Sequence, residues 1–206
     1  MSARAEYHHG NLRRALLDAA LALFVERQRF DFTMRELARA AQVTHNAPYR
    51  HFADRWALLD ALAAEGFALL REEQLAAAKD HVGDPRTRIA KLGEGYVRFA
   101  EAHPHHFRLM FLRPLRGASA ELARAARTTF MPLEEAIADA EARGLLRPGL
   151  KKRDLAVAAW SLVHGLASLV VGGQLPLTRR GLRGRIDALT TVFTEGAFVG
   201  GRKRGG

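Results

Sequence analysis

Apolar residues recur at helical spacing along almost the whole chain, and this pattern constrains the fold more than any other feature. In the first such segment, residues 11–28, the side chains of Leu12, Leu16, Leu23 and Phe24 fall on one helical face. No stretch alternates between apolar and polar residues as a half-buried strand would. The sequence therefore predicts an all-α fold.

Capping residues divide this pattern into separate helices. Thr33 followed by Glu36 is a capping box, in which each residue satisfies a free backbone N–H of the other. Thr44 and Asp54 are of the type that caps a helix N-terminus. The helices that we predict cover residues 11–28, 34–40, 44–51, 55–78, 85–103, 105–112, 119–143, 154–172 and 178–197.

Composition narrows the class of protein. The 206 residues include no cysteine, which excludes a disulfide framework, a thiolate zinc site and a cysteine nucleophile, and is compatible with the cytoplasmic location that we expect. Residues 1–10 lack the apolar core of a signal peptide. The net charge of +10 favours a polyanionic partner such as nucleic acid, although the basic clusters at 151–153, 179–180 and 202–204 are scattered and do not locate its site.

One segment is long enough to raise the question of a membrane. Residues 155–173 carry no formally charged side chain, and the length of this uncharged segment is marginally sufficient for a transmembrane span. The segment contains Ser161, His164 and Ser168 and many alanines and glycines, which gain little from lipid. We therefore expect no membrane partner, and predict a buried helix in the core of an oligomer.

Two short helices joined by a tight turn, with a longer helix before them, form the basic helix-turn-helix DNA-binding unit. With the predicted spacing, Leu37, Ala38, Val43 and Phe52 point inward against the first helix, and the third helix turns its other side outward. Plain helical packing explains the same spacing, so geometry alone leaves both interpretations open.

The residues of this segment are more specific. Thr33 to Arg55 read TMRELARAAQVTHNAPYRHFADR and are followed by Ala-Leu-Leu. This closely resembles the DNA-binding signature of the TetR (tetracycline-repressor) family, which has a cap before the first short helix, a valine ending the turn, and Tyr-x-His-Phe-x-x-Lys/Arg before a long helix. The resemblance covers about residues 12–62.

The resemblance implies a three-helix DNA-binding domain over residues 1–53 and a long connector helix. This helix leads into a ligand-binding and dimerisation domain over residues 54–199, and a disordered basic tail over 200–206 completes the chain. The implied function is a ligand-released repressor that binds a pseudo-palindromic double-stranded DNA operator as a homodimer. Two departures affect the geometry. Gln42 replaces the family's turn glycine and Pro48 its leucine. We expect the third helix to survive, shifted in how deeply it seats, because Pro48 falls at about its fourth position and removes only the first intrahelical bond.

By the same resemblance, individual residues acquire DNA-binding roles. Tyr49, His51 and Arg55 match positions that contact phosphates, and Arg50 is a neighbour that faces the backbone. Arg35 can reach a guanine, and Asn46 suits adenine by its bidentate geometry. Thr33 can pair with a phosphate or act only as a cap, whereas Arg27 and Arg39 are expected to be solvated. The predicted DNA-binding residues are Thr33, Arg35, Thr44, His45, Asn46, Ala47, Tyr49, Arg50, His51 and Arg55.

The second half resembles a sub-branch of the family marked by a Trp and then His-Gly, here Trp160, His164 and Gly165. Trp160 and His164 are four apart and share a helical face. The last helix carries a seam suited to bundle packing, formed by Leu182, Ile186, Leu189 and Phe193. We predict that this seam forms the dimer contact, with an intramolecular core as the alternative.

The family resemblance also implies a cavity for a small apolar or amphipathic effector. Aromatic and methionine residues at this spacing are more often plain core, and spacing does not separate the two. The candidate ligand-binding residues are Phe107, Met110, Phe111, Phe130, Trp160 and His164, with Met131 as a further lining candidate.

Other functions have weaker support in the sequence. His103, His105 and His106 lie near Glu101, but Pro104 breaks the helix and removes the i, i+4 face of the common zinc motifs, so no metal or other cofactor is predicted. No nucleophile stands at motif spacing from a base, and no enzyme is predicted. Two alternatives stay open: an architectural DNA-binding dimer without an effector, and a small-molecule-binding helical protein that does not bind DNA.

Overall fold

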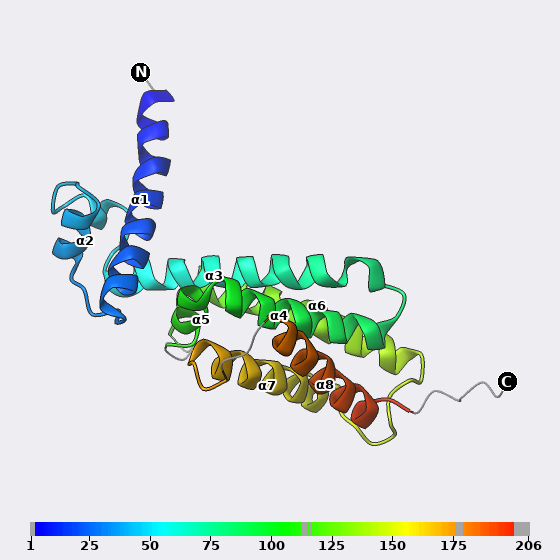
Figure 1. Ribbon diagram of the computed structural model, residues 1–206. Coiled ribbons are helices and arrows are strands. Elements are labelled where there is room, and N and C mark those ends of the chain that lie inside the picture. The colour runs from blue at the N-terminus through cyan, green and yellow to red at the C-terminus, as the bar shows by residue number, and fades with distance from the viewer. Residues whose placement is uncertain (1–2, 113–114, 116, 176–178, 200–206) are drawn as a thin grey trace. The chain divides into compact units, whose positions relative to one another are not determined.

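A computed structural model describes residues 3–112, 115, 117–175 and 179–199, and over these residues the fold is all-α, as predicted. The one β-type pairing among them is an isolated bridge between Leu146 and Phe198. The predicted disordered tail, residues 200–206, lies outside the described residues. The helices are α1 (Ala3–Arg27), α2 (Met34–Ala40), η1 (Pro48–Arg50), α3 (Arg55–Ala78), η2 (Lys79–His81), α4 (Pro85–Ala102), α5 (Pro104–Met110), α6 (Ala120–Ala142), α7 (Lys152–Val171) and α8 (Arg179–Ala197), where η marks a short 3-10 helix (Figure 1).

The chain divides into two compact units. The first comprises residues 1–66 and 105–124, and the second comprises residues 67–104 and 125–206. The first unit therefore takes in the start of α3 together with α5 and the first turn of α6. These compact units do not coincide with the predicted functional domains, which meet between residues 53 and 54. The functional division stays a prediction.

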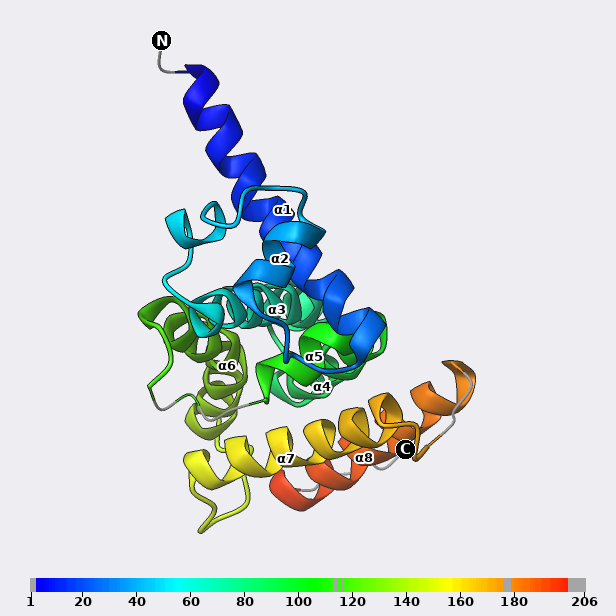
Figure 2. The same cartoon turned by 90° about the vertical axis from the view of Figure 1, so that its left-hand side faces the viewer.

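In the first unit, α2 packs against α1 (Figure 2). The predicted inward face of α1 is confirmed, since Leu16, Ala20 and Phe24 are all buried. Leu37 of α2 and Phe52 are buried in the same unit. The helix begins earlier than residue 11, at Ala3, because a single Gly10 costs about 1 kcal/mol in a helix and does not stop it.

The predicted third α-helix, residues 44–51, is wrong. The structure has a turn followed by one turn of 3-10 helix, Pro48–Arg50. Pro48 has no N–H to donate to the carbonyl of Thr44, and its ring crowds that carbonyl. The backbone instead closes i to i+3 bonds, from Ala47 N to Thr44 O at 2.9 Å and from His51 N to Pro48 O at 3.0 Å. The proline thus changes the kind of helix rather than its seating.

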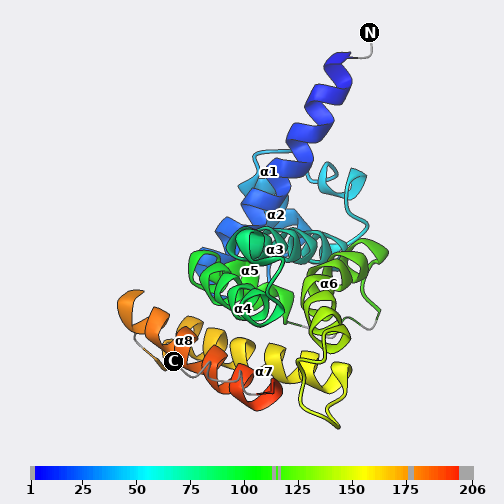
Figure 3. The same cartoon turned by 90° about the vertical axis from the view of Figure 1, so that its right-hand side faces the viewer.

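In the second unit, α4 packs against both α7 and α8 (Figure 3). Ile89 and Leu92 of α4 are buried in a core with Ile137 of α6 and Leu155 of α7. The other face of α4 approaches α3 so closely that a Cβ on Gly95 would lie 2.6 Å from Gln74 Cα and 2.7 Å from Glu73 O. A glycine is therefore required where these two backbones meet.

The predicted dimer seam on the last helix packs inside the subunit instead. Leu182 and Ile186 of α8 are buried with Val97 and Leu166, and Leu189 packs against the same cluster. Phe193 packs against the larger core. An amphipathic repeat shows which face is apolar but not which helix covers it, and here the cover comes from α4 and α7 of the same chain.

Helix α7 has one unusual property. By length and composition it could cross a membrane, with a mean hydropathy of 1.6 over an 18-residue window, yet only 22% of that window is buried. Val157 and Leu169 are 47% and 44% exposed. The expected buried helix is therefore only partly buried within one subunit.

Candidate nucleic-acid interface

The start of α2 is held by a dense set of polar contacts. The hydroxyl of Thr33 accepts from Glu36 N at 3.2 Å, while Thr33 N donates to the carboxylate of Glu36 at 2.7 Å. The same carboxylate pairs with Arg27 of α1 at 2.8 Å, so Arg27 is not simply solvated as expected. The backbone bond from Thr33, followed by the bond from Arg27, lowers the pKa of Glu36 to about 2. The Thr33 hydroxyl also donates to Glu36 at 2.8 Å, which supports its role as a cap.

The turn after α2 accommodates a side chain in a conformation that favours glycine. Gln42 has a φ of +55°, in the left-handed region. Val43 N donates to Ala38 O and Gln42 N donates to Arg39 O, at 2.9 and 3.1 Å. These are the two bonds of a Schellman motif, which closes the last carbonyls of α2. The turn keeps the geometry of a glycine turn at the cost of strain at Gln42.

Residues 44–50, which we call the recognition segment, follow this turn. Thr44, His45, Asn46, Tyr49 and Arg50 are exposed, with Tyr49 at 55%. The segment packs against α2, on which Arg35 is also exposed. The outward position predicted for these side chains is therefore available to a ligand.

Two predicted contact residues are less accessible. Ala47 is only 8% exposed, so its methyl group packs inside the unit and cannot read a base edge in this conformation. His51 is half-buried, with its ring 6.5 Å from that of Phe52. The 3-10 geometry of the segment turns Ala47 inward beside the buried Pro48.

Arg55 begins α3, the helix for which Asp54 Oδ1 accepts from Ala57 N at 2.8 Å. Its guanidinium donates to Phe32 O at 3.4 Å and lies 5.1 Å from the ring centroid of Trp56. Trp56 is 42% exposed, and no motif or spacing in the sequence marks it as a contact residue. The geometry places a fixed cation and an aromatic face beside the N-terminus of a long helix, a suitable environment for a phosphate.

Comparison with known families identifies the fold. A sequence profile described as bacterial regulatory proteins of the tetR family matches residues 16–62, and one described as the tetracyclin repressor-like C-terminal domain matches residues 89–193. The second match alone covers half of the chain. The chain belongs to the TetR family of transcriptional regulators. It is a DNA-binding transcriptional regulator, and members of this family are generally non-enzymatic transcription factors.

Solved structures agree with this membership. A protein of unknown function from Rhodococcus sp. RHA1 is 34% identical, with 93% of this chain and 97% of that chain covered and a TM-score of 0.78. A TetR family regulator from Marinobacter aquaeolei VT8 is 15% identical, with 94% and 98% covered and a TM-score of 0.71. The fatty acid degradation regulator FadR from Bacillus halodurans is 14% identical, with 89% and 95% covered and a TM-score of 0.73. The last two share the fold alone. No curated protein matches the sequence.

In the C-terminal half of this TetR protein, Trp160 and His164 meet at one hydroxyl. Trp160 Nε1 donates to Tyr96 OH at 3.4 Å, and the same oxygen lies 2.9 Å from His164 Nδ1. The ring of Phe130 meets that of Trp160 edge-on, with centroids 5.9 Å apart. Burial raises the pKa of Tyr96 well above its usual value, and burial lowers that of His164. Both groups are therefore neutral near pH 7.

The remaining candidate ligand residues fall into two groups. Phe107 and Met110 of α5 are buried in the first unit, where Phe107 meets Phe111 edge-on at 5.3 Å. Phe130, Trp160 and His164 belong to the second unit. Met131 is 39% exposed, so its predicted place in a cavity lining is not supported.

The histidines near residue 105 contact different neighbours. His103 stacks on Phe99, and His105 meets the edge of Phe24. His106 pairs with Glu65. Within the part of the chain that the structure describes, no group of three potential ligands could hold a metal ion.

Proposed function

We propose that this TetR regulator is a cytoplasmic homodimer that represses transcription by binding a pseudo-palindromic operator and is released by an apolar or amphipathic effector. The observation that carries the dimer is an exposed apolar face on α7 and α8. The recognition segment provides the DNA contact, and symmetric pairing of two such segments matches two half-sites about 34–36 Å apart.

The dimer face follows a spacing of four residues. On α7 it comprises Val157, Ser161, Gly165 and Leu169, all exposed except the half-buried Gly165. In a single subunit, a methyl group on Gly165 would meet nothing within 4 Å. Small and apolar side chains in a row let a second helix approach closely, as helix pairs in bundles do.

Helix α8 repeats the pattern beside it. Gly184, Ala188 and Val192 are exposed at the same spacing, with Val192 at 66% and open space around Gly184. Two such helices from each subunit would form a four-helix bundle. The proposed dimer thus uses the same helices as the sequence predicted. Its contact face is the side of α8 opposite the seam that is buried inside the subunit.

A matched pair of substitutions tests this face. Val192→Arg places a charge on the proposed interface, and Val82→Arg places the same charge at a residue of similar exposure, 62%, outside α7 and α8. In sedimentation at micromolar concentration, the wild type and Val82→Arg should be dimers, and Val192→Arg a monomer that binds the operator poorly. A monomeric wild type, or a dimeric Val192→Arg, contradicts the proposal.

DNA reading divides among the exposed residues. Arg35→Ala and Asn46→Ala should relax the preference at particular base pairs, by about 1–3 kcal/mol each, because each loses a bidentate contact to a base edge. Tyr49, Arg50, His51 and the other backbone contacts should act on all sequences alike. Affinities for a panel of operator variants separate the two classes. A uniform loss for Arg35→Ala would contradict its base-reading role.

The effector contacts that we propose are Phe130, Trp160 and His164, which all belong to the second unit, while Phe107, Met110 and Phe111 of the first unit stay separate candidates. The hydroxyl shared by Trp160 and His164, beside the ring of Phe130, supports a ligand with one polar end and an apolar body. Because one structural neighbour is named for fatty acid degradation, alkanoic acids are the first compounds to test.

The chain has only two tryptophans, which simplifies this test. In Trp56→Phe the emission of Trp160 reports ligand binding alone, and an alkanoate that binds should weaken operator affinity about 5- to 150-fold. Trp160→Phe should weaken the affinity for the alkanoate, while Trp56→Phe should leave that affinity unchanged. Equal operator affinity with and without a bound ligand favours the architectural alternative instead.

A further inference from the structure

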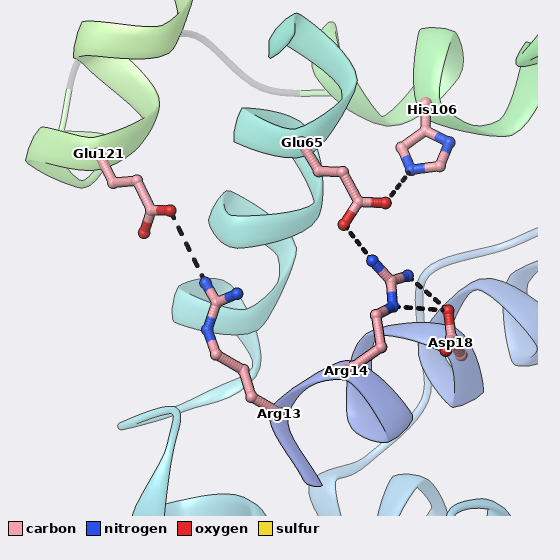
Figure 4. Close-up of polar contacts among 6 residues, drawn as sticks. All are labelled: Arg13, Arg14, Asp18, Glu65, His106 and Glu121. Atoms are coloured by element: carbon pink, nitrogen blue, oxygen red, sulfur yellow. Dashed lines mark hydrogen bonds and ion pairs between the residues drawn. The ribbon is translucent and has the colours of Figure 1, made fainter. Parts of the chain in front are cut away.

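Two neighbouring arginines on α1 connect it to distant parts of the first unit (Figure 4). Arg14 Nη1 lies 2.6 Å from Glu65 Oε2 on α3, and Arg14 Nε donates to Asp18 at 2.9 Å. The other oxygen of Glu65 lies 3.2 Å from Nε2 of His106 on α5. One carboxylate therefore joins α1 and α5 across α3.

This cluster is better shielded than an ordinary surface pair. The side chains of Glu65 and His106 are 27% and 10% exposed, while that of Arg14 is 45% exposed. The bond to Asp18, opposed by burial and supported by Glu65, raises the pKa of Arg14 above its usual range. The cation is thus permanent, and its bond to Glu65 is less open to competition from water than exposed pairs are.

The register of α3 on α5 is fixed beside this cluster. A Cβ on Gly66 would lie 2.7 Å from Met110 Sδ and 3.2 Å from the Cβ of His106. The two helices therefore approach as closely as a glycine allows. Sliding of α5 along α3 would change the distance from Glu65 to His106 directly.

The cluster also lies where the chain passes between the two compact units. The chain leaves the first unit after Gly66 and returns at His105. Glu65 and His106 are each next to one of these crossings. A displacement transmitted along α3, or through the junction before α5, thus reaches the two residues that hold Arg14.

We propose that Glu65 is a positioning residue for operator binding. Its carboxylate fixes the register of α1 against α3 and α5, and α1 in turn packs on α2 and so sets how the recognition segment is presented. Effector release, on which this inference rests through the proposed function, acts by loosening the Arg14–Glu65–His106 contacts. Glu65 positions the recognition segment although it is not itself part of the exposed DNA-binding surface.

The neighbouring arginine of α1 provides a matched control. Arg13 pairs with Glu121 of α6, but at 3.7 Å and with side chains 42% and 56% exposed. Glu121→Gln removes the same charge as Glu65→Gln from a weaker and wetter pair, so it should change operator affinity less than about twofold.

The test uses the full-length protein and an operator duplex at fixed salt. Glu65→Gln and Arg14→Gln should each weaken operator binding by roughly three- to tenfold, and the double variant should be no weaker than either single variant. Arg14→Lys should restore part of the loss, and the salt dependence of Glu65→Gln should match that of wild type, because no phosphate contact is lost. Thermal melts confirm that each variant is folded at the assay temperature.

A second measurement does not depend on DNA. Hydrogen exchange of the α1 amides around residues 12–20 should be faster in Glu65→Gln than in wild type and unchanged in Glu121→Gln. The inference is overturned if exchange is unchanged, if the losses from Arg14 and Glu65 add, or if Glu65→Gln binds the operator as well as wild type does. In the last case operator binding by the wild type would leave the proposed function intact. A wild type that binds no duplex would contradict both the proposed function and this inference.

Discussion

Replacing Arg55 by alanine separates two contributions of one side chain. In the free protein its guanidinium donates to Phe32 O at 3.4 Å and covers the ring of Trp56 at 5.1 Å. In the proposed complex it also contacts a phosphate. The first role contributes to the stability of the first unit, and the second contributes to operator affinity.

The structural contribution is small. A long hydrogen bond and a cation–π contact on an exposed ring each contribute about 0.5–1 kcal/mol. Arg55→Ala should therefore lower the free energy of unfolding by about 1–2 kcal/mol, which for a chain of this size corresponds to a fall of about 2–8 °C in Tm. The variant remains folded at 25 °C.

The contribution to DNA binding is larger and depends on salt. Each lost phosphate contact reduces the slope of log affinity against log salt by about 0.9, hence by about 1.8 for a dimer. Between 50 and 200 mM salt this amounts to about a 12-fold smaller loss of affinity than wild type shows. Specific and scrambled duplexes should be affected alike, since phosphate carries no sequence information.

The control is Arg143→Ala, which removes the same charge from the second unit. Arg143 bonds to Asp139 Oδ1 and to Gly83 O, both at 2.8 Å. Fluorescence anisotropy over the salt series should show an unchanged slope for this variant. If Arg55→Ala and Arg143→Ala change the slope equally, the effect is one of overall charge, and the assignment of Arg55 to a phosphate is refuted.

Four further predictions concern the scaffold of the site. Thr33→Ala should lower stability by about 1 kcal/mol in thermal melts, and Thr33→Ser should not, because the hydroxyl acts as a cap; a Thr33→Ala variant that melts like wild type would contradict this role. Gln42→Gly should raise Tm, because glycine relieves a φ of +55°, and an unchanged or lower Tm would contradict strain there. Glu36 has a folded-state pKa of about 2 against 4.5, so its stabilisation is complete above pH 4.5 and lost as pH falls toward 2; melts of Glu36→Gln should lack this dependence. Gly95→Ala should cost about 1–3 kcal/mol, since its methyl would overlap the backbone of α3, whereas Gly83→Ala, with nothing within 4 Å, should melt like wild type.

The sequence predicts best where the determining signals are local. The bounds of the helices at 34–40 and 55–78 agree with the structure residue by residue. Both start signals, Thr33 with Glu36 and then Asp54, make the hydrogen bonds that their positions suggest. Such caps act within one helical turn, so the surrounding fold has little influence on them.

The third helix shows where two local signals compete. Thr44 has the character of an N-cap, and Pro48 was expected to be tolerated in the first turn. Proline is harmless only where its missing N–H has no partner to lose, and at position 48 it faces the carbonyl of Thr44. The structure resolves this by 3-10 bonds, which also turn Ala47 inward. The spacing correctly predicted which other residues of the recognition segment are exposed, but not that Ala47 is buried.

Long-range contacts were beyond sequence reasoning. Glu65 reaches Arg14 across 51 residues, and Tyr96 reaches His164 across 68, and no periodicity marks either pair. The same holds for the seam at Leu182 and Ile186, whose apolar face was predicted but whose cover comes from other elements of the subunit.

The contact at Tyr96 gives a physical reason for the spacing of Trp160 and His164. An indole N–H and an imidazole nitrogen can approach one oxygen only if both side chains leave the helix on the same face, one turn apart. Residues 160 and 164 satisfy this, and their rings are 5.7 Å apart. Because Trp160 Nε1 only donates, Tyr96 OH accepts from it, and the tautomer of the neutral imidazole decides which partner donates in the second bond, between Tyr96 OH and His164 Nδ1. The pair on α7 is therefore half of a hydrogen-bonded cluster, and the tyrosine on α4 completes it.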